Sequence, residues 1–208
     1  YNSVDPEVYR RDARACQRRR FAAEDEKLIV HISNFRPVKR VGDAILAFAR
    51  IVRTTPARLL MIGDGPDREQ AAALAEQLGV ADRVQWLGQQ PAVQCFLAIA
   101  DLFLFPSEGE SFGLAALEAM ACETPVAAYR AGGLPEVVID GENGLLCEVG
   151  DVEGLASASL RILNDPDMRR AMGEAARRRV LDHFAADRII PRYEQIYHRL
   201  LSRSALAR

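Results

Sequence analysis

Residues 27–63 read "KLIVHISNFRPVKRVGDAILAFARIVRTTPARLLMIG", in which two short apolar runs flank one amphipathic segment. The runs "KLIVHIS" and "RLLMIG" have the length and the aliphatic content of buried parallel strands. Between them Val41, Ile45, Phe48 and Val52 recur at helical spacing, which predicts a helix over residues 41–54. A strand, a helix and a second strand in this order predict a parallel unit with a right-handed crossover.

The alternation continues to about residue 147 with four more strand-like runs, "RVQWLG", "DLFLFPS", "PVAAY" and "GLLCEV". We therefore predict an α/β fold, a Rossmann-like doubly wound parallel sheet, for residues 28–150. Residues 1–27 are interpreted as a linker with a short helical arm. Residues 151–208 are predicted to form C-terminal helices that pack on this core, over 151–164, 166–182 and 187–203, with Asp165 and Asp187 as N-caps.

The composition argues against several classes of protein. The 208 residues carry 27 Lys and Arg against 29 Asp and Glu, so a net charge of -2 offers no basic surface for nucleic acid. The apolar runs are much shorter than a membrane span and the first residues lack a signal-peptide pattern, which predicts a soluble, cytoplasmic protein. Cys16, Cys95, Cys122 and Cys147 form no CxxC pair and are interpreted as reduced thiols. We assign no metal ligand, expect no cofactor and leave the oligomeric state open.

Ligands of open α/β sheets bind beyond the carboxyl ends of the strands, so the loops at those ends are the candidate site. They read "SNFRPVKR" (33–40), "GDGPD" (63–67), "GQQ" (88–90), "PSEGESFG" (106–113) and "AGGLPE" (131–136). Their glycines, basic side chains and helix-start amides favour an anionic, phosphate-bearing ligand. Arg36 and Lys39 are candidate phosphate ligands, although solvated surface charges beside Arg40 are the commoner case.

The stretch "PSEGESFGLAALEAMA" (106–121) holds two carboxylates, Glu110 and Glu118, around the start of a helix. Ser107 and Glu110 have the spacing of a capping box, which is the structural alternative for Glu110. Glu118 has mostly apolar neighbours on a helix predicted to start near Phe112, so a buried Glu118 needs a partner. Eight residues span roughly 12 Å if helical throughout, about the length of a sugar-diphosphate-ribose axis. A nucleotide sugar would satisfy both carboxylates and the amides of residues 111–114.

These motifs resemble, in the same order, those of the retaining glycosyltransferases of family GT4. "ESFGLAALE" (110–118) is similar to the E-x7-E element, and "GDGP" (63–66), "AGGLPEVV" (131–138) and "DGENGLL" (140–146) are similar to the other motifs of that family. The resemblance implies a GT-B enzyme with two Rossmann-like domains, of which this chain is the C-terminal, donor-binding half. It implies that the acceptor binds mainly to the other domain and that this half alone is inactive.

The resemblance also implies a role for each matching residue. Glu110 contacts the donor sugar, Glu118 the ribose and Lys39 the diphosphate. Further donor contacts are expected from Asn34, Gly63, Gly65, Gln89, Gln90, Ser111, Phe112, Gly113 and Leu114. Asn34 stands where many members have Arg, a charge that Arg36 would supply. Glu123 stands where the family usually has Gly, and it would be strained if that Gly has a positive φ.

The strings "HISNFRPVKRV" and "YNSVDPEVYRR" narrow the resemblance to a bacillithiol-pathway subgroup that transfers N-acetylglucosamine from UDP to L-malate with retention. The alternatives are another GT4 transferase, using UDP-glucose or a GDP-sugar, or a nucleotide-binding module without catalysis. In the enzyme, Lys39, Arg36 and the helix amides would stabilise the charge on the departing diphosphate, while Glu110 orients the hexose. This half shows no well-placed carboxylate nucleophile, which favours a same-face attack guided by the leaving phosphate.

Overall fold

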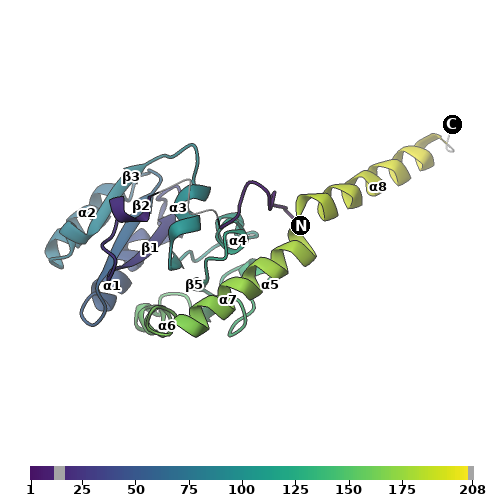
Figure 1. Cartoon of the computed structure of the whole chain (residues 1–208). Helices are drawn as coiled ribbons and strands as arrows, with labels where there is room; N and C mark the ends of the chain where they lie inside the picture. Colours follow the sequence, from purple (N-terminus) through teal and green to yellow (C-terminus); the bar gives the residue numbers. More distant parts are fainter. Residues whose placement is uncertain (12–16, 206–208) are drawn as a thin grey trace.

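The structure is a computed structural model that describes residues 1–11 and 17–205 (Figure 1). Its centre is a six-stranded parallel sheet with the order β3-β2-β1-β4-β5-β6. Each apolar run of the sequence forms one strand, so the predicted doubly wound sheet is confirmed. The strands are β1 (Lys27–Ile32), β2 (Ala57–Ile62), β3 (Val84–Gly88), β4 (Leu102–Phe105), β5 (Val126–Tyr129) and β6 (Gly144–Cys147).

Two layers of helices cover the sheet because neighbouring residues of each strand face opposite sides. Ile29 packs in one cluster with Phe48 and Leu155, whereas Val30 packs in the other with Leu117. The first layer holds α1 (Val41–Ile51), α2 (Arg68–Gln77) and α6 (Val152–Asn164). The second holds α3 (Gln94–Ile99), α4 (Leu114–Ala121), α5 (Leu134–Val137) and α7 (Pro166–Arg179), and short 3₁₀ turns lie at Arg18–Arg20, Pro37–Lys39 and Ala81–Arg83.

The C-terminal helices begin and end close to the predicted positions. Asp165 caps α7, since its Oδ1 accepts a hydrogen bond of 2.9 Å from the Met168 amide, as predicted. The N-cap assigned to Asp187 is wrong, because α8 (Ala186–Ala205) has already begun at the preceding residue. The sequence reasoning missed Asp151, whose Oδ1 caps α6 by accepting from the Gly154 amide at 2.8 Å.

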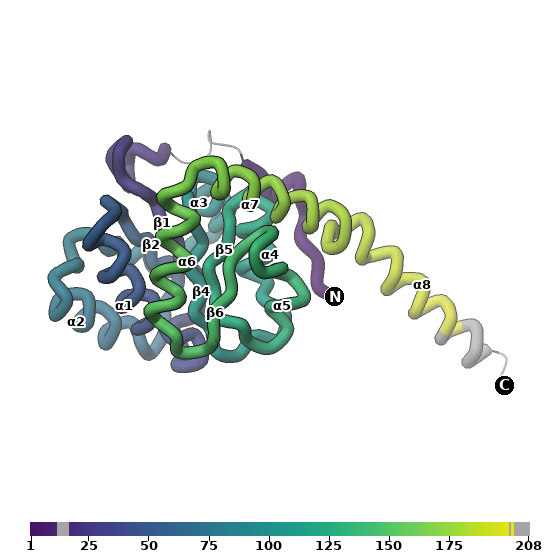
Figure 2. Tube along the Cα trace, turned by 90° about the horizontal axis from the view of Figure 1, so that it is seen from below, coloured from purple at the N-terminus to yellow at the C-terminus, as the bar shows by residue number. Residues whose placement is uncertain are grey.

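Helix α8 points away from the sheet after a π-helical turn at Val180–Phe184 (Figure 2). One surface of this helix exposes large apolar side chains, namely Ile190, Tyr193, Ile196, Tyr197 and Leu201. Within the described residues, no helix is long and apolar enough to cross a membrane.

The first residues are attached to the body of the molecule. Val4 is buried, its amide donates to Phe184 O at 3.1 Å, and its carbonyl accepts from the Ala186 amide at 3.0 Å.

The expectation of four reduced thiols is wrong for Cys95, which is disulfide-bonded, whereas Cys122 and Cys147 are free thiols. Cys16 lies outside the described residues.

Glu123 ends helix α4 in a Schellman motif that suits glycine. The Glu123 amide donates to Met120 O at 3.0 Å and the Thr124 amide to Ala119 O at 3.0 Å, and Glu123 itself has a φ of 58°. This backbone is the left-handed conformation that a glycine adopts freely after a helix. Glu123, which replaces the family glycine, is therefore strained, as expected.

We predict that Glu123→Gly stabilises the chain. The left-handed backbone costs a non-glycine residue roughly 1–2 kcal/mol, and the entropy of an unfolded glycine offsets part of the gain, so the unfolding free energy should rise by about 0.5–1 kcal/mol. Urea denaturation measures the change. The matched control is Glu142→Gly, since Glu142 does not have a positive φ and its replacement should lower the unfolding free energy. A lower stability of Glu123→Gly would contradict the strain.

Candidate functional site

The loops after β1, β2 and β3 are joined at one edge of the sheet. The Ser33 amide donates to Ile62 O at 3.1 Å, and the Gly63 amide donates to Gly88 O at 2.8 Å. A Cβ on Gly63 would lie 1.8 Å from Ser33 O, and one on Gly65 would lie 2.1 Å from Asn34 O. These two glycines are therefore needed for the close approach of the loops, and the structure brings Asn34, Gly63 and Gly65 together.

The loop that carries Lys39 is held by a buried histidine. His31 Nδ1 lies 2.9 Å from Leu104 O, and a carbonyl only accepts, so Nδ1 carries the proton. His31 Nε2 then accepts from the Ser33 hydroxyl at 2.8 Å, and Ser33 Oγ accepts from the Phe35 amide at 3.3 Å. Burial lowers the pKa of His31 to about 4. The hydrogen bond with Leu104 opposes this shift, and the nearby charge of Lys39 adds to it. The low pKa keeps the ring neutral.

Lys39 and Glu110 form an ion pair at the centre of the edge. Lys39 Nζ donates to Glu110 Oε1, and the two side chains are only 19% and 10% exposed. The ammonium also lies over the Phe105 ring, 5.7 Å from its centroid. The alternative of a solvated surface charge is therefore wrong for Lys39.

The two arginines beside Lys39 have different surroundings. Arg36 is exposed at the start of the 3₁₀ turn Pro37–Lys39. Arg40 Nε donates to Asp43 Oδ2 at 2.7 Å, and its Nη1 donates to Glu108 Oε2 at 2.8 Å. Arg40 is thus neutralised by two carboxylates, which leaves Arg36 as the neighbouring cation that can meet a ligand.

The capping box predicted as an alternative for Glu110 is wrong. The Ser107 hydroxyl donates to Val38 O at 3.1 Å, and α4 begins only at Leu114, with Gly113 as its N-cap at a φ of 90°. Residues 110–113 are therefore not helical, so the span of roughly 12 Å does not apply to the whole E-x7-E element. The backbone of Glu110 is instead fixed by the loop after β5, because the Gly133 amide donates to Glu110 O at 2.7 Å.

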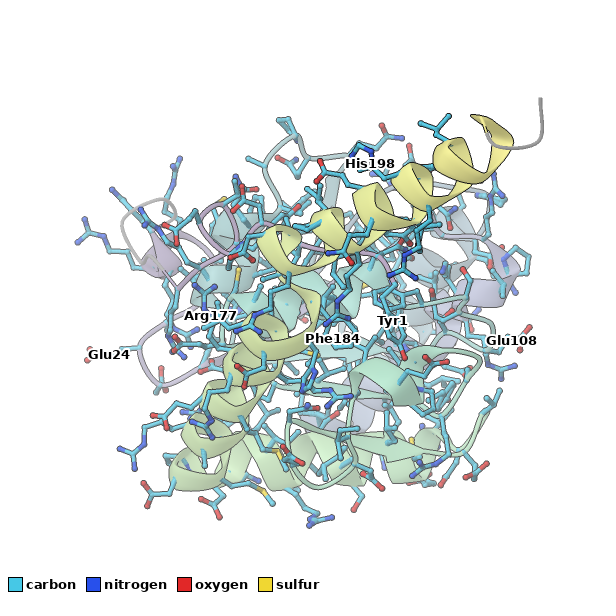
Figure 3. All side chains as sticks on the ribbon, turned by 90° about the vertical axis from the view of Figure 1, so that its right-hand side faces the viewer. Tyr1, Glu24, Glu108, Arg177, Phe184 and His198 are labelled. Carbon is cyan, nitrogen blue, oxygen red and sulfur yellow. The ribbon has the colours of Figure 1, made fainter. Side chains whose placement is uncertain are left out.

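The turn before α4 presents its backbone to the edge. Helix α4 has no acidic residue in its first turn and no side-chain cap, so its first amides keep their donor capacity for a ligand. The Phe112 ring packs in an aromatic cluster with Phe184 at 5.6 Å and Tyr1 at 6.0 Å between centroids. Figure 3 shows Tyr1 and Phe184 side by side at the base of α8. Ser111 and Leu114 are exposed at this turn.

Glu118 is half-buried and has a partner that the sequence reasoning missed. The Tyr9 hydroxyl donates to Glu118 Oε1 at 2.9 Å. Burial raises the pKa of Glu118, and the hydrogen bond from Tyr9 opposes that shift. The string "YNSVDPEVYRR" contains Tyr9, but nothing in the spacing of these residues indicates a contact 109 positions away.

The loop after β3 places its two glutamines differently. Gln89 is exposed, whereas Gln90 is partly buried and its Nε2 donates to Leu87 O at 2.6 Å. The carbonyl oxygen and the second N–H of the Gln90 side-chain amide are therefore left to meet a ligand. Among the described residues, no group of three or more His, Cys, Asp or Glu side chains could hold a metal ion.

Residues 14–179 match the family described as glycosyl transferases group 1, and the chain belongs to this family. N-acetyl-alpha-D-glucosaminyl L-malate synthase of Bacillus anthracis is 46% identical over 202 residues, which cover 97% of this chain and 53% of that protein. The resemblance carried by the motifs is thereby confirmed. The chain spans about half the length of the curated relatives that it matches.

Solved structures share the fold over nearly the whole chain. Sucrose-phosphate synthase from Thermosynechococcus elongatus matches with a TM-score of 0.88 and 31% identity, covering 97% of this chain and 52% of that one. Anabaena HepE, solved in complex with UDP and glucose, matches with a TM-score of 0.86 and 26% identity, covering 97% of this chain and 56% of that one.

We predict that His31 makes the chain sensitive to mild acid. The unfolded histidine has an ordinary pKa of about 6.5, so below that pH the unfolded state binds a proton that the folded state excludes until about pH 4. This contribution is fully present above the unfolded pKa and is lost as the pH falls. It amounts to roughly 3 kcal/mol of unfolding free energy between about pH 7 and pH 4.

Urea denaturation at a series of pH values measures this contribution. In His31→Gln the neutral side chain removes it, so the loss of stability on acidification should be smaller by that amount. The exposed His183 offers the control His183→Gln, which should keep the full acid dependence of the unaltered chain. An unaltered acid dependence in His31→Gln would show that His31 is not the group excluded from protonation.

Proposed function

We propose that this chain is the donor-binding half of a retaining glycosyltransferase, which transfers N-acetylglucosamine from UDP to L-malate. The observation that carries the proposal is the Lys39–Glu110 ion pair beside the uncapped start of α4. A sugar diphosphate has hydroxyls that can donate to a carboxylate, next to phosphate charge that can bind an ammonium group and helix amides. The 46% identity to the malate synthase supports the choice of sugar and acceptor.

The proposal gives each part of the edge one task. Lys39 and the exposed Arg36 bind the diphosphate together with the backbone amides of Ser111, Phe112, Gly113 and Leu114. Glu110 binds hydroxyls of the sugar next to Lys39, and Glu118 accepts the hydroxyls of the ribose. Asn34, Gly63 and Gly65 line the phosphate side, and Gln89 and Gln90 lie toward the base.

The reaction follows from the charges. As the bond between the sugar and UDP breaks, negative charge grows on the diphosphate, and Lys39, Arg36 and the α4 amides stabilise it. Glu110 holds the hexose in the orientation for attack by the acceptor hydroxyl on the same face. The leaving phosphate takes the acceptor proton in this scheme, and Glu110 is assigned to the sugar hydroxyls, not to nucleophilic attack.

A second domain completes the cleft in this proposal, since the matched relatives are about twice as long as this chain. Residues 1–27 would link the two domains, residues 28–150 bind the donor, and residues 151–208 pack on the core and reach toward the partner domain. The exposed apolar surface of α8, formed by Ile190, Tyr193, Ile196, Tyr197 and Leu201, would dock there. The acceptor would bind mainly to that domain, and the cytoplasmic location stays a prediction.

Calorimetric titration with UDP, GDP and UDP-N-acetylglucosamine tests the donor. We predict that the chain prefers UDP to GDP and that Glu118→Ala weakens UDP binding by roughly 10- to 150-fold, the effect of losing hydrogen bonds to a charged group. Glu174→Ala is the control, because Glu174 is an exposed carboxylate on α7. A preference for GDP would point to another transferase of the family. Equal binding by Glu118→Ala would refute the ribose role.

The complete enzyme tests catalysis by Lys39. Lys39→Ala should lower kcat by roughly 10- to 150-fold, because one charge-assisted contact to the leaving diphosphate is lost. Lys27→Ala removes the same charge from the opposite end of β1 and should leave kcat unchanged. Steady-state kinetics with UDP-N-acetylglucosamine and L-malate give both values. A wild-type kcat in Lys39→Ala would remove Lys39 from the reaction, and turnover by the 208-residue chain alone would show that no second domain is needed.

A further inference from the structure

The N-terminal segment, residues 1–11, reaches the carboxylate of Glu118 with one of its side chains. Tyr9 is partly buried and its hydroxyl donates to Glu118 Oε1 at 2.9 Å. Tyr9 belongs to no helix or strand of the sheet domain, and it meets a carboxylate on the second turn of α4. A phenylalanine could fill the same space but could not make this hydrogen bond.

Arg177 on α7 holds the backbone of the N-terminal segment against the end of α4. Its Nη1 donates to Tyr9 O at 2.5 Å and to Ala121 O at 2.6 Å, while Nη2 donates to Pro6 O at 2.9 Å. Ala121 is the last residue of α4, the helix that carries Glu118. One guanidinium therefore holds the backbone of Tyr9 and the end of α4 in a fixed relation. Figure 3 shows Arg177 on the ribbon of α7.

We propose that Tyr9 is a positioning residue of the nucleotide site, which occupies one oxygen of Glu118 and directs the other toward the ribose hydroxyls. This inference rests on the proposed function, in which Glu118 binds the ribose. The terminal torsion of a glutamate has a broad energy profile, so a fixed donor is needed to select one orientation of the carboxylate. The free oxygen has two lone pairs, enough for two vicinal hydroxyls.

The groups around Glu118 link the role of Tyr9 to the pKa of Glu118. Glu118 faces the Tyr9 hydroxyl from the N-terminal segment and the Cys122 thiol at the C-cap of α4, and Arg177 of α7 acts on that thiol. Burial raises the pKa of the Cys122 thiol to about 12, so it stays neutral. Burial also raises the pKa of Glu118, and the Tyr9 hydroxyl counteracts this. Without that hydroxyl the pKa of Glu118 rises further, and the carboxylate is lost at a higher pH.

The test is UDP binding by Tyr9→Phe, measured by calorimetry over about pH 5 to 8. This variant keeps the ring and the backbone contacts with Arg177, so the segment stays docked. We expect UDP to bind roughly five- to tenfold more weakly at neutral pH. We also expect the loss of affinity on acidification to begin at higher pH. Tyr197→Phe is the matched control, because it removes one exposed hydroxyl from α8.

A comparison of UDP with 2′-deoxy-UDP separates positioning from a general loss of structure. If Tyr9 aims Glu118 at the ribose, the preference for UDP should fall by at least about threefold in Tyr9→Phe. Because both ligands are measured on the same preparation, their ratio does not depend on the fraction of folded protein. A purely structural role of Tyr9 would lower both affinities equally and leave the ratio unchanged.

Each outcome decides a different claim. If Glu118→Ala weakens UDP binding but Tyr9→Phe binds UDP as the unaltered chain does, Tyr9 has no positioning role and the proposed function stands. If Tyr9→Phe binds UDP more tightly, the hydroxyl competes with the ribose for Glu118, and the inference is overturned. If Glu118→Ala has no effect, the ribose role of Glu118 fails, and the positioning role of Tyr9 fails with it.

Discussion

The Lys39–Glu110 ion pair joins two loops that leave neighbouring strands in the middle of the sheet. Strand β1 precedes the loop of Lys39, strand β4 precedes the loop of Glu110, and the two strands lie side by side where the strand order reverses. Crossovers from this point run to opposite sides, which opens a crevice between the two loops. The Glu108 amide reinforces the junction by donating to Val38 O at 2.9 Å. The junction therefore holds the loops of Lys39 and Glu110 against each other.

The ion pair is suited to binding more than to stability. Both groups lose hydration in a partly buried place, and this desolvation largely offsets their attraction, so the pair adds little to the folding free energy. Its value lies in the ligand-free state, where each charge satisfies the other. In the proposed function, a diphosphate binds Lys39 while sugar hydroxyls donate to Glu110, so both groups keep hydrogen-bond partners when the ion pair is broken. The neighbouring Arg40 cannot serve in this way, because Asp43 and Glu108 already hold it.

The layers of the fold follow from local patterns, whereas the contacts of the site do not. The strands were predictable because each apolar run is bounded by Gly, Pro or Asp, and the cap at Asp165 because its spacing is local. The strain at Glu123 was predictable only from the resemblance to the family. The capping box, an alternative suggested by the spacing of Ser107 and Glu110, is wrong because the Ser107 hydroxyl bonds to Val38, 69 residues away. His31 and Tyr9 gave no signal, because their partners lie 73 and 109 residues away and come together only in the folded chain.

Backbone strain is concentrated in the loop that carries Lys39. Phe35 and Arg40 flank this residue with positive φ values of 41° and 46°, which cost non-glycine residues of order 1–3 kcal/mol each. Such a loop keeps its shape only where its surroundings determine it more than once. The Phe35 ring is fully buried, the His31 and Ser33 side chains hold its amide, and two carboxylates hold Arg40. Lys39 is thus fixed by its neighbours before any ligand arrives. Binding therefore costs little conformational entropy at this side chain.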